Sequence, residues 1–248
     1  MDFEANSQRH LKLISNLKIK LFADGADPAQ IAKAQLNPVI KGFTTNPSLM
    51  RAAGVSRYEA FARSALEVIA DKPISFEVVA DDICEMERQA RLISSWGENV
   101  YVKIPITNTK REPTAPLVKR LSEAGVKVNV TAIMTLAQVR ETATSLANGA
   151  PSVISVFAGR IADTGRDPIP IMTEAANLLS AYPQIELLWA SPREVLNIFQ
   201  ANDCGCHIIT ATDSLLSKLN NISKDLDEYS LETVLMFHTD AVRSGYQL

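Results

Sequence analysis

Cysteine is scarce in this chain of 248 residues, which contains three: Cys84, Cys204 and Cys206. An odd and small number of cysteines cannot build a disulfide framework and is typical of a protein from a reducing compartment. Cys204-Gly205-Cys206-His207 contains good zinc ligands, but a complete tetrahedral set is missing. We therefore interpret this segment as small residues that enter a buried strand, rather than as a metal site.

The chain also lacks an excess of positive charge and long apolar runs. It contains 25 Lys and Arg residues and 28 Asp and Glu residues, which gives a formal net charge of -3. This balance gives no electrostatic reason to expect a nucleic acid or an anionic membrane as partner. No stretch approaches the roughly 18 apolar residues of a membrane span, and Met1–Asn6 does not resemble the start of a signal peptide. The sequence predicts a cytoplasmic location.

No Gly/Ser-rich linker, charge block or low-complexity segment divides the chain. Hydrophobic residues make up 46% of it, enough for a substantial core. Its length is close to the roughly 250 residues of a single (β/α)₈ barrel, although two smaller domains are the alternative. We predict one domain over residues 1–248.

Short aliphatic runs alternate with longer amphipathic stretches along the chain. Eight strands are predicted, over residues 19–23, 39–43, 74–79, 100–104, 126–130, 153–157, 185–189 and 207–210. Eight such units close most naturally into an α/β fold, a parallel TIM barrel over about residues 19–220. The alternative is an open doubly wound sheet, which is disfavoured because no Gly-x-Gly-x-x-Gly turn follows the first strand.

Several helix starts can be read directly from the sequence. Asp27-Pro28, Thr135 and Asp167-Pro168 are typical N-terminal signals, and Ser191-Pro192 predicts another helix start. Apolar residues at helical spacing predict an extra C-terminal helix over about residues 231–246, which we expect to pack on the barrel or on a second subunit.

Lys103 is the most unusual polar residue, because it lies within the predicted strand Val100–Ile104. Burying an ammonium group there costs several kcal/mol unless it is paired or loses its proton. A neutral amine could form a Schiff base with a carbonyl substrate. The alternative is a lysine that points outward between helices, with its stem along an apolar surface.

Other polar residues lie in or just after the remaining predicted strands, at the end of a barrel where enzymes keep their chemistry. Each has a structural explanation when taken alone, such as a turn, a helix start or a surface charge. Together they would place carboxylates, amides, hydroxyls and guanidinium groups on one rim. They are Asp24, Thr44, Asn46, Glu77, Asn129, Thr131, Ser155, Arg160 and Arg193.

This set of groups has a chemical logic. A protonated imine on Lys103 would accept electrons from a breaking carbon–carbon bond, and one carboxylate would take the proton of the departing hydroxyl. A second carboxylate and a hydroxyl would manage the water of imine formation and hydrolysis. Two arginines could hold a phosphate. The sequence thus predicts aldol chemistry without a metal.

These residues occur in motifs that resemble the transaldolase family, a group of class I aldolase barrels. The resemblance extends from about Leu21 to Leu219. Its motifs are Leu21-Phe22-Ala23-Asp24, Gly42 to Leu49, Ser75-Phe76-Glu77-Val78, Val102-Lys103-Ile104-Pro105, Val128-Asn129-Val130-Thr131, Ser155 to Ile161, and Ala190-Ser191-Pro192-Arg193.

The resemblance implies a role for each matching residue. Lys103 would be the Schiff-base lysine and Asp24 the acid/base of carbon–carbon cleavage. Glu77 and Thr131 would hold and activate the catalytic water. The substrate-binding set would be Thr44, Asn46, Asn129, Ser155, Phe157, Arg160, Ser191 and Arg193.

The implied reaction transfers a dihydroxyacetone unit from a ketose phosphate, such as fructose 6-phosphate or sedoheptulose 7-phosphate, to an aldose phosphate. It needs neither cofactor nor metal, and its implied place is carbohydrate metabolism, the pentose phosphate pathway. Glu77 and Phe157 are the transferase-like residues where similar fructose 6-phosphate aldolases carry Gln and Tyr. Such an aldolase is the alternative activity, and a non-catalytic sugar-phosphate-binding barrel is a third. The resemblance also predicts a homo-oligomer, as in the short-chain branch of the family.

Overall fold

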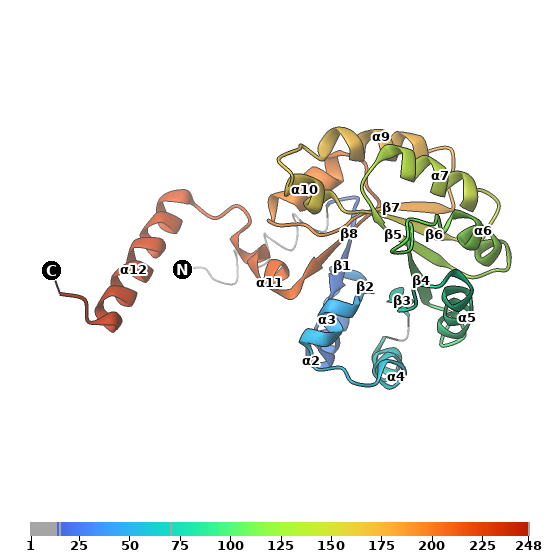
Figure 1. Cartoon of the computed structure of the whole chain (residues 1–248). Helices are drawn as coiled ribbons and strands as arrows, with labels where there is room; N and C mark the ends of the chain where they lie inside the picture. Colours follow the sequence, from blue (N-terminus) through green and yellow to red (C-terminus); the bar gives the residue numbers. More distant parts are fainter. Residues whose placement is uncertain (1–13, 15, 70, 248) are drawn as a thin grey trace.

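The computed structural model describes residue 14, residues 16–69 and residues 71–247, and it shows eight parallel strands in a closed barrel (Figure 1). Each strand pairs with the next in the chain, and β8 closes on β1. The prediction of a (β/α)₈ barrel is confirmed. The strands are β1 (Lys20–Asp24), β2 (Ile40–Thr44), β3 (Ile74–Glu77), β4 (Val100–Pro105), β5 (Val128–Ile133), β6 (Ser152–Val156), β7 (Ile185–Trp189) and β8 (Ile208–Thr212).

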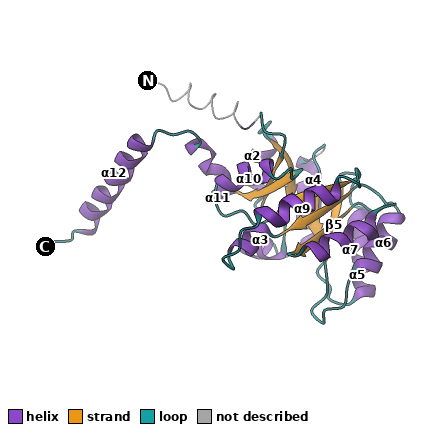
Figure 2. Cartoon of the chain, turned by 90° about the horizontal axis from the view of Figure 1, so that it is seen from above, coloured by secondary structure: helices purple, strands orange, loops and turns teal. Residues whose placement is uncertain are grey.

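Helices surround the barrel on its outside, as Figure 2 shows from above. The helices before the C-terminal one are α2 (Pro28–Gln35), α3 (Pro47–Ala52), α4 (Tyr58–Val68), α5 (Ile83–Ser94), α6 (Ala115–Glu123), α7 (Leu136–Leu146), α8 (Ala158–Ala162), α9 (Ile169–Leu179), α10 (Leu196–Asp203), α11 (Asp213–Leu216) and the 3₁₀ helix η1 (Ser217–Asn221). The last helix, α12 (Leu226–Ser244), lies apart from the barrel (Figure 1).

The alternation of side chains along each strand divides the core into two parts. Outward-facing residues such as Val102 and Ile104 pack against the helices in the main apolar cluster. A smaller cluster inside the barrel includes Phe22, Leu188 and Ile208. Gly42 makes room for the Phe22 ring, since a Cβ at this position would lie 2.4 Å from it. This apolar layer closes the barrel beneath the polar strand ends.

The helix-start signals are confirmed at three sites and wrong at one. After Asp167-Pro168, α9 begins at Ile169, whose backbone N–H donates a hydrogen bond to Asp167 Oδ1. The Asp27 carboxylate accepts hydrogen bonds from the first turn of α2, and Thr135 forms a capping box with Gln138 at the start of α7. Ser191-Pro192 does not begin a helix, because α10 starts at Leu196. The loop after β7 instead holds Ser191 at a φ of 61°, in the left-handed region.

The Cys204–His207 segment leads into β8. Cys204 and Cys206 are both buried, and His207 Nδ1 accepts a hydrogen bond from the backbone N–H of Leu187. In the part of the chain that the structure describes, no group of three His, Cys, Asp or Glu side chains is placed to hold a metal ion.

The C-terminal helix α12 begins five residues before the predicted start and extends away from the barrel (Figures 1 and 2). None of its residues is buried, although it carries the large apolar side chains of Leu231, Val234, Leu235 and Phe237. Of the two expected surfaces, the barrel is therefore wrong, and a second subunit stays a prediction. The spacing of apolar residues in the sequence indicates that one face of the helix needs a partner surface. It does not indicate which surface that is. Within the described residues, no helix is long and apolar enough to cross a membrane.

Candidate active site

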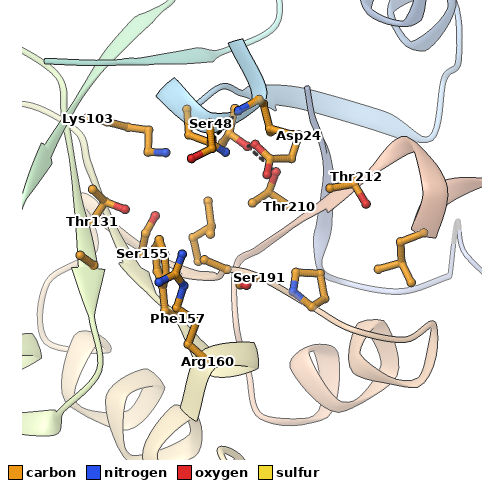
Figure 3. Close-up of a pocket in the computed structure, with 18 of the residues that line it drawn as sticks. Asp24, Ser48, Lys103, Thr131, Ser155, Phe157, Arg160, Ser191, Thr210 and Thr212 are labelled. Atoms are coloured by element: carbon orange, nitrogen blue, oxygen red, sulfur yellow. Dashed lines mark hydrogen bonds between the residues drawn. The ribbon is translucent and has the colours of Figure 1, made fainter. Parts of the chain in front are cut away.

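A cavity of about 740 Å³ opens at the carboxyl ends of the strands. Its wall contains eleven of the twelve residues that the sequence predicted for the site; the twelfth, Asn129, lies elsewhere. Figure 3 shows Lys103 and Thr131 on one side of this cavity, Asp24 and Thr210 on another, and Arg160 and Ser191 facing them. The barrel brings these residues together because parallel strands all end at the same rim.

Lys103 points into the barrel and is 7% exposed, so the alternative of an outward-facing lysine is wrong. Its Nζ lies 3.1 Å from Glu77 Oε2 and donates a hydrogen bond of 2.9 Å to the backbone carbonyl of Thr45. Glu77 is the neighbour of Lys103 in the pairing of β3 with β4. Of the two ways to tolerate a buried lysine, pairing and loss of the proton, the structure shows pairing.

Asp24 ends β1 at the cavity wall. Burial raises the pKa of its carboxyl group above the usual range, although the nearby Lys103 charge and a hydrogen bond from Thr44 act in the opposite direction. The Thr44 hydroxyl donates that bond to Asp24 Oδ1 over 2.7 Å. A carboxyl group with a raised pKa is suited to both accepting and donating a proton near neutral pH.

Thr131 presents an unused hydroxyl group to the cavity. Its side chain is 2% exposed, and its Oγ1 has no hydrogen-bond partner in the described part of the chain. The next residue, Ala132, has a φ of 62°, and the pairing of β5 with β6 is irregular between Val130 and Ile133. Such bulges commonly redirect side chains next to active sites. A buried hydroxyl without a protein partner is a natural place for a water molecule or a substrate oxygen.

Asn129 is positioned differently from the prediction. It does not line the cavity; its amide nitrogen donates to Ser75 Oγ over 3.0 Å, and its amide oxygen accepts from Ser155 Oγ over 2.6 Å. Ser155 itself lines the cavity. The structure therefore places Asn129 beneath the cavity, where it orients Ser155.

Asn46 lies in the cavity wall after β2. Its side-chain oxygen accepts a hydrogen bond from the backbone N–H of Leu49 and thereby caps α3. The amide NH₂ group remains as a donor, because the capping bond uses the oxygen.

The two predicted phosphate-binding arginines come from α8 after β6 and from the loop after β7. The Arg160 guanidinium lies 5.3 Å above the centre of the Phe157 ring, and Arg193 forms an ion pair with Asp163 through two nitrogens. The two segments meet closely at Gly159, where an added Cβ would lie 1.6 Å from the Ser191 carbonyl oxygen. This contact joins the backbones of the two segments, both of whose arginines line the cavity.

Sequence reasoning missed five polar residues in the cavity wall. Ser48 lies two residues after the predicted Asn46, whereas the others come from β8 and the segment after it. The sequence could have indicated these residues, because a predicted eighth strand of the barrel must end at the same rim as the other strands. The missed residues are Ser48, Thr210, Thr212, Ser214 and Lys218.

Comparison with known proteins identifies the family of this barrel. A sequence model described as "Transaldolase/Fructose-6-phosphate aldolase" matches residues 21–245, which is most of the chain. The chain belongs to this family. The expected resemblance is thereby confirmed at the level of the family, and the transaldolase/fructose-6-phosphate aldolase barrel accounts for the order of the motifs.

Individual relatives agree with this assignment. A protein named "Probable transaldolase" from Streptococcus agalactiae is 33% identical over 88% of this chain and 96% of its own length. Another of the same name, from Methanococcus maripaludis, is 34% identical over 82% of this chain and 90% of its own. The solved structure of 2,3-dimethylmalate lyase has a TM-score of 0.55 over 98% of this chain and 88% of its own, with 11% identity, which is a likeness of fold alone.

Proposed function

We propose that this family member is a transaldolase, which transfers a dihydroxyacetone unit from a ketose phosphate to an aldose phosphate through a Schiff base on Lys103. The observation that carries this proposal is the buried Lys103 side chain, which faces a polar cavity and has the Glu77 carboxylate 3.1 Å from its Nζ. An amine enclosed in this way is protected from water, and a proton acceptor is already in place.

Imine formation would begin with transfer of the Lys103 proton to Glu77. The free amine attacks the ketone carbon of the substrate, and the resulting carbinolamine loses its hydroxyl group as water when Glu77 returns the proton. The Thr131 hydroxyl, which has no partner among the described residues, is available to hold this water molecule. The same two groups would guide water back to the imine when the product is released.

Carbon–carbon cleavage would use Asp24 on another part of the wall. Its carboxylate takes the proton from the hydroxyl group on the carbon next to the breaking bond, and that carbon leaves as an aldehyde. The bonding electrons move into the iminium group and form an enamine on Lys103. In the second half of the reaction, an acceptor aldehyde replaces the first one, and Asp24 returns the proton to the new hydroxyl group.

The phosphate of donor and acceptor would bind at the opposite end of the cavity. Arg160 and Arg193 supply guanidinium donors there, and Ser191 adds a hydroxyl group. A phosphate held by these arginines, across the cavity from the amine, would suit fructose 6-phosphate and sedoheptulose 7-phosphate, whose phosphate is remote from the ketone.

Reduction with borohydride in the presence of fructose 6-phosphate tests this proposal. We expect a three-carbon adduct on the peptide that contains Lys103, found by mass analysis, and no adduct on the Lys103→Ala protein. A protein that binds the sugar but never yields an adduct would be a non-catalytic sugar-phosphate-binding barrel, and the proposal would be wrong.

Cleavage without transfer is the second candidate, because the matching family includes fructose-6-phosphate aldolases. The two activities differ in the fate of the enamine, which is either captured by an aldose phosphate or protonated and released. Free dihydroxyacetone should form much more slowly than transfer product when erythrose 4-phosphate is present. Equal rates with and without this acceptor would favour the aldolase.

We also propose that the chain forms a homo-oligomer through α12. This helix exposes several large apolar side chains and buries none of its residues, so a partner surface is needed to remove them from water. Light scattering should give a mass of more than one chain for the parent protein and a smaller mass for a Val234→Asp, Phe237→Asp double variant. A monomeric parent would contradict the proposal.

A further inference from the structure

Thr210 is a buried residue of the cavity wall that none of the steps above uses. Its side chain is 6% exposed, and its Oγ1 lies 2.6 Å from Thr44 Oγ1. Thr44 in turn donates to Asp24 Oδ1 over 2.7 Å. These three side chains come from adjacent strands, since β1 lies between β2 and β8 in the closed barrel. They form a continuous chain of hydrogen bonds that ends on the proposed acid/base.

The chemistry of the groups fixes the direction of this chain when Asp24 is ionised. A carboxylate can only accept, and a hydroxyl group has one hydrogen to donate. Thr44 donates its only hydroxyl hydrogen to Asp24, so Thr210 must be the donor in the hydrogen bond between the two threonines. The hydrogens then run from Thr210 to Thr44 to Asp24, and each oxygen has one defined role.

We propose that Thr210 is a positioning residue, which acts through Thr44 to hold Asp24 Oδ1 so that Oδ2 faces the substrate hydroxyl group. This inference rests on the proposed function and deepens it. Asp24 Oδ2 receives no hydrogen bond from the described residues and remains available for the proton transfer. Without a donor at Thr210, the Thr44 hydroxyl could turn away from Asp24.

The direction of these hydrogen bonds also determines which substrate groups can bind next to Thr210. Because Thr210 gives its hydrogen to Thr44, it can only accept a hydrogen bond from the substrate. This wall is therefore suited to a hydroxyl group of a sugar chain and unsuited to a phosphate or a ketone oxygen. The position of one predicted phosphate-binding arginine agrees with this preference, because Arg160 lies across the cavity from Thr210 in Figure 3.

The groups around Asp24 determine its pKa, and loss of the Thr210 hydroxyl group should change that pKa. Burial is the main cause that raises the pKa of Asp24, the Lys103 charge on β4 lowers it, and the Glu77 charge on β3 raises it slightly. The hydrogen bond from Thr44 on β2 also lowers it. Hydrogen bonds in a chain strengthen one another, so removal of the Thr210 donor should weaken the Thr44–Asp24 bond and raise this pKa further. The further cations in the cavity wall, Arg160, Arg193 and Lys218, are unchanged by the substitution.

The experiment uses Thr210→Val, which keeps the shape and removes the hydroxyl group, and Thr210→Ser, which keeps the hydroxyl group. We expect kcat of Thr210→Val to fall between roughly threefold and tenfold, as for the loss of one hydrogen bond. The acid limb of its pH profile should move to higher pH, while KM for fructose 6-phosphate changes little. Thr210→Ser should restore the parent pH profile.

A matched control is available on α7. Thr142 is fully buried, and its Oγ1 has no hydrogen-bond partner among the described residues. Thr142→Val should leave kcat and the pH profile unchanged, which separates the removal of a buried hydroxyl group from a change in the site. Thermal unfolding of each variant reports whether the protein remains folded.

A double variant provides a second, independent test of the inference. Because Thr210 acts through Thr44, the Thr44→Val, Thr210→Val protein should be no slower than Thr44→Val alone. A parent pH profile in Thr210→Val, or additive losses in the double variant, would overturn the inference. A parent protein that forms no borohydride adduct would instead overturn the proposed function, so the two failures are distinguishable.

Discussion

Lys103 and Glu77 form a buried ion pair across the neighbouring strands β4 and β3, with 3.1 Å between Nζ and Oε2. The pair compensates for the burial of both groups and places a proton acceptor beside the amine. It also couples the two residues, so replacing either one changes the surroundings of the other.

Lys103→Ala should lower transaldolase activity by on the order of 10³-fold or more, as is usual for loss of a covalent nucleophile. The substitution also leaves Glu77 without its partner in a partly buried position, so a lower melting temperature is expected. The coupled assay with erythrose 4-phosphate as acceptor measures the activity. Lys103→Ala, Glu77→Gln should recover melting temperature without recovering activity. Turnover of Lys103→Ala at the parent rate would show that the amine is not the nucleophile.

Glu77→Gln should slow the steps that involve water, by roughly 10² to 10⁴-fold, because an amide cannot accept the proton from Lys103. If the adduct still forms slowly, its hydrolysis should be slowed as well. A time course of borohydride trapping then shows slow appearance and long persistence of the adduct. Glu59→Gln, on the exposed face of α4, is a suitable control. Parent rates of adduct formation and decay in Glu77→Gln would contradict the role of Glu77.

Arg193→Ala should raise KM for fructose 6-phosphate by about tenfold or more and lower kcat less, because a charged hydrogen bond to phosphate contributes roughly 1.5–3 kcal/mol. The rate with unphosphorylated fructose should be nearly unchanged. Asp163→Asn is an informative partner, since Asp163 occupies two nitrogens of Arg193. Release of Arg193 should lower KM. An unchanged KM in Arg193→Ala would place the phosphate elsewhere.

Asp24→Asn should abolish carbon–carbon cleavage and stabilise the protein at neutral pH. The pKa of Asp24 is raised in the folded state from its ordinary value of 3.8, mainly by burial. The folded state therefore binds the proton more tightly, and the contribution of this group to stability is lost as pH rises through the folded pKa. Removing the buried charge should gain about 1 kcal/mol at pH 7, or roughly 2–4 °C in melting temperature.

The gain should shrink as pH falls through the raised folded pKa of Asp24, because the carboxyl group of the parent protein then becomes protonated. Melting curves of both proteins between pH 4 and pH 8 test this relationship. A constant difference across this range would show that Asp24 carries no burial penalty.

The order of the elements follows from local patterns in the sequence. Aliphatic runs at regular intervals predicted all eight strands, because strands buried on both faces read as continuous apolar segments. Asp27 and Thr135 predicted helix starts from hydrogen bonds that form within one turn. The motifs around Lys103 also indicated the family without knowledge of the fold.

The direction of each side chain was decided by the tertiary structure. The run Val100–Pro105 is apolar on both sides of Lys103, so sequence alone leaves two orientations open, and closure of the barrel selects the inward one. Asn129 lies beneath the cavity and Thr210 in its wall for the same reason: their depth depends on how the neighbouring strands are staggered. Contacts between distant segments, such as Thr210 with Thr44, have no local signal. The sequence determined which groups are present and in which order, whereas packing of the barrel decided which of them meet.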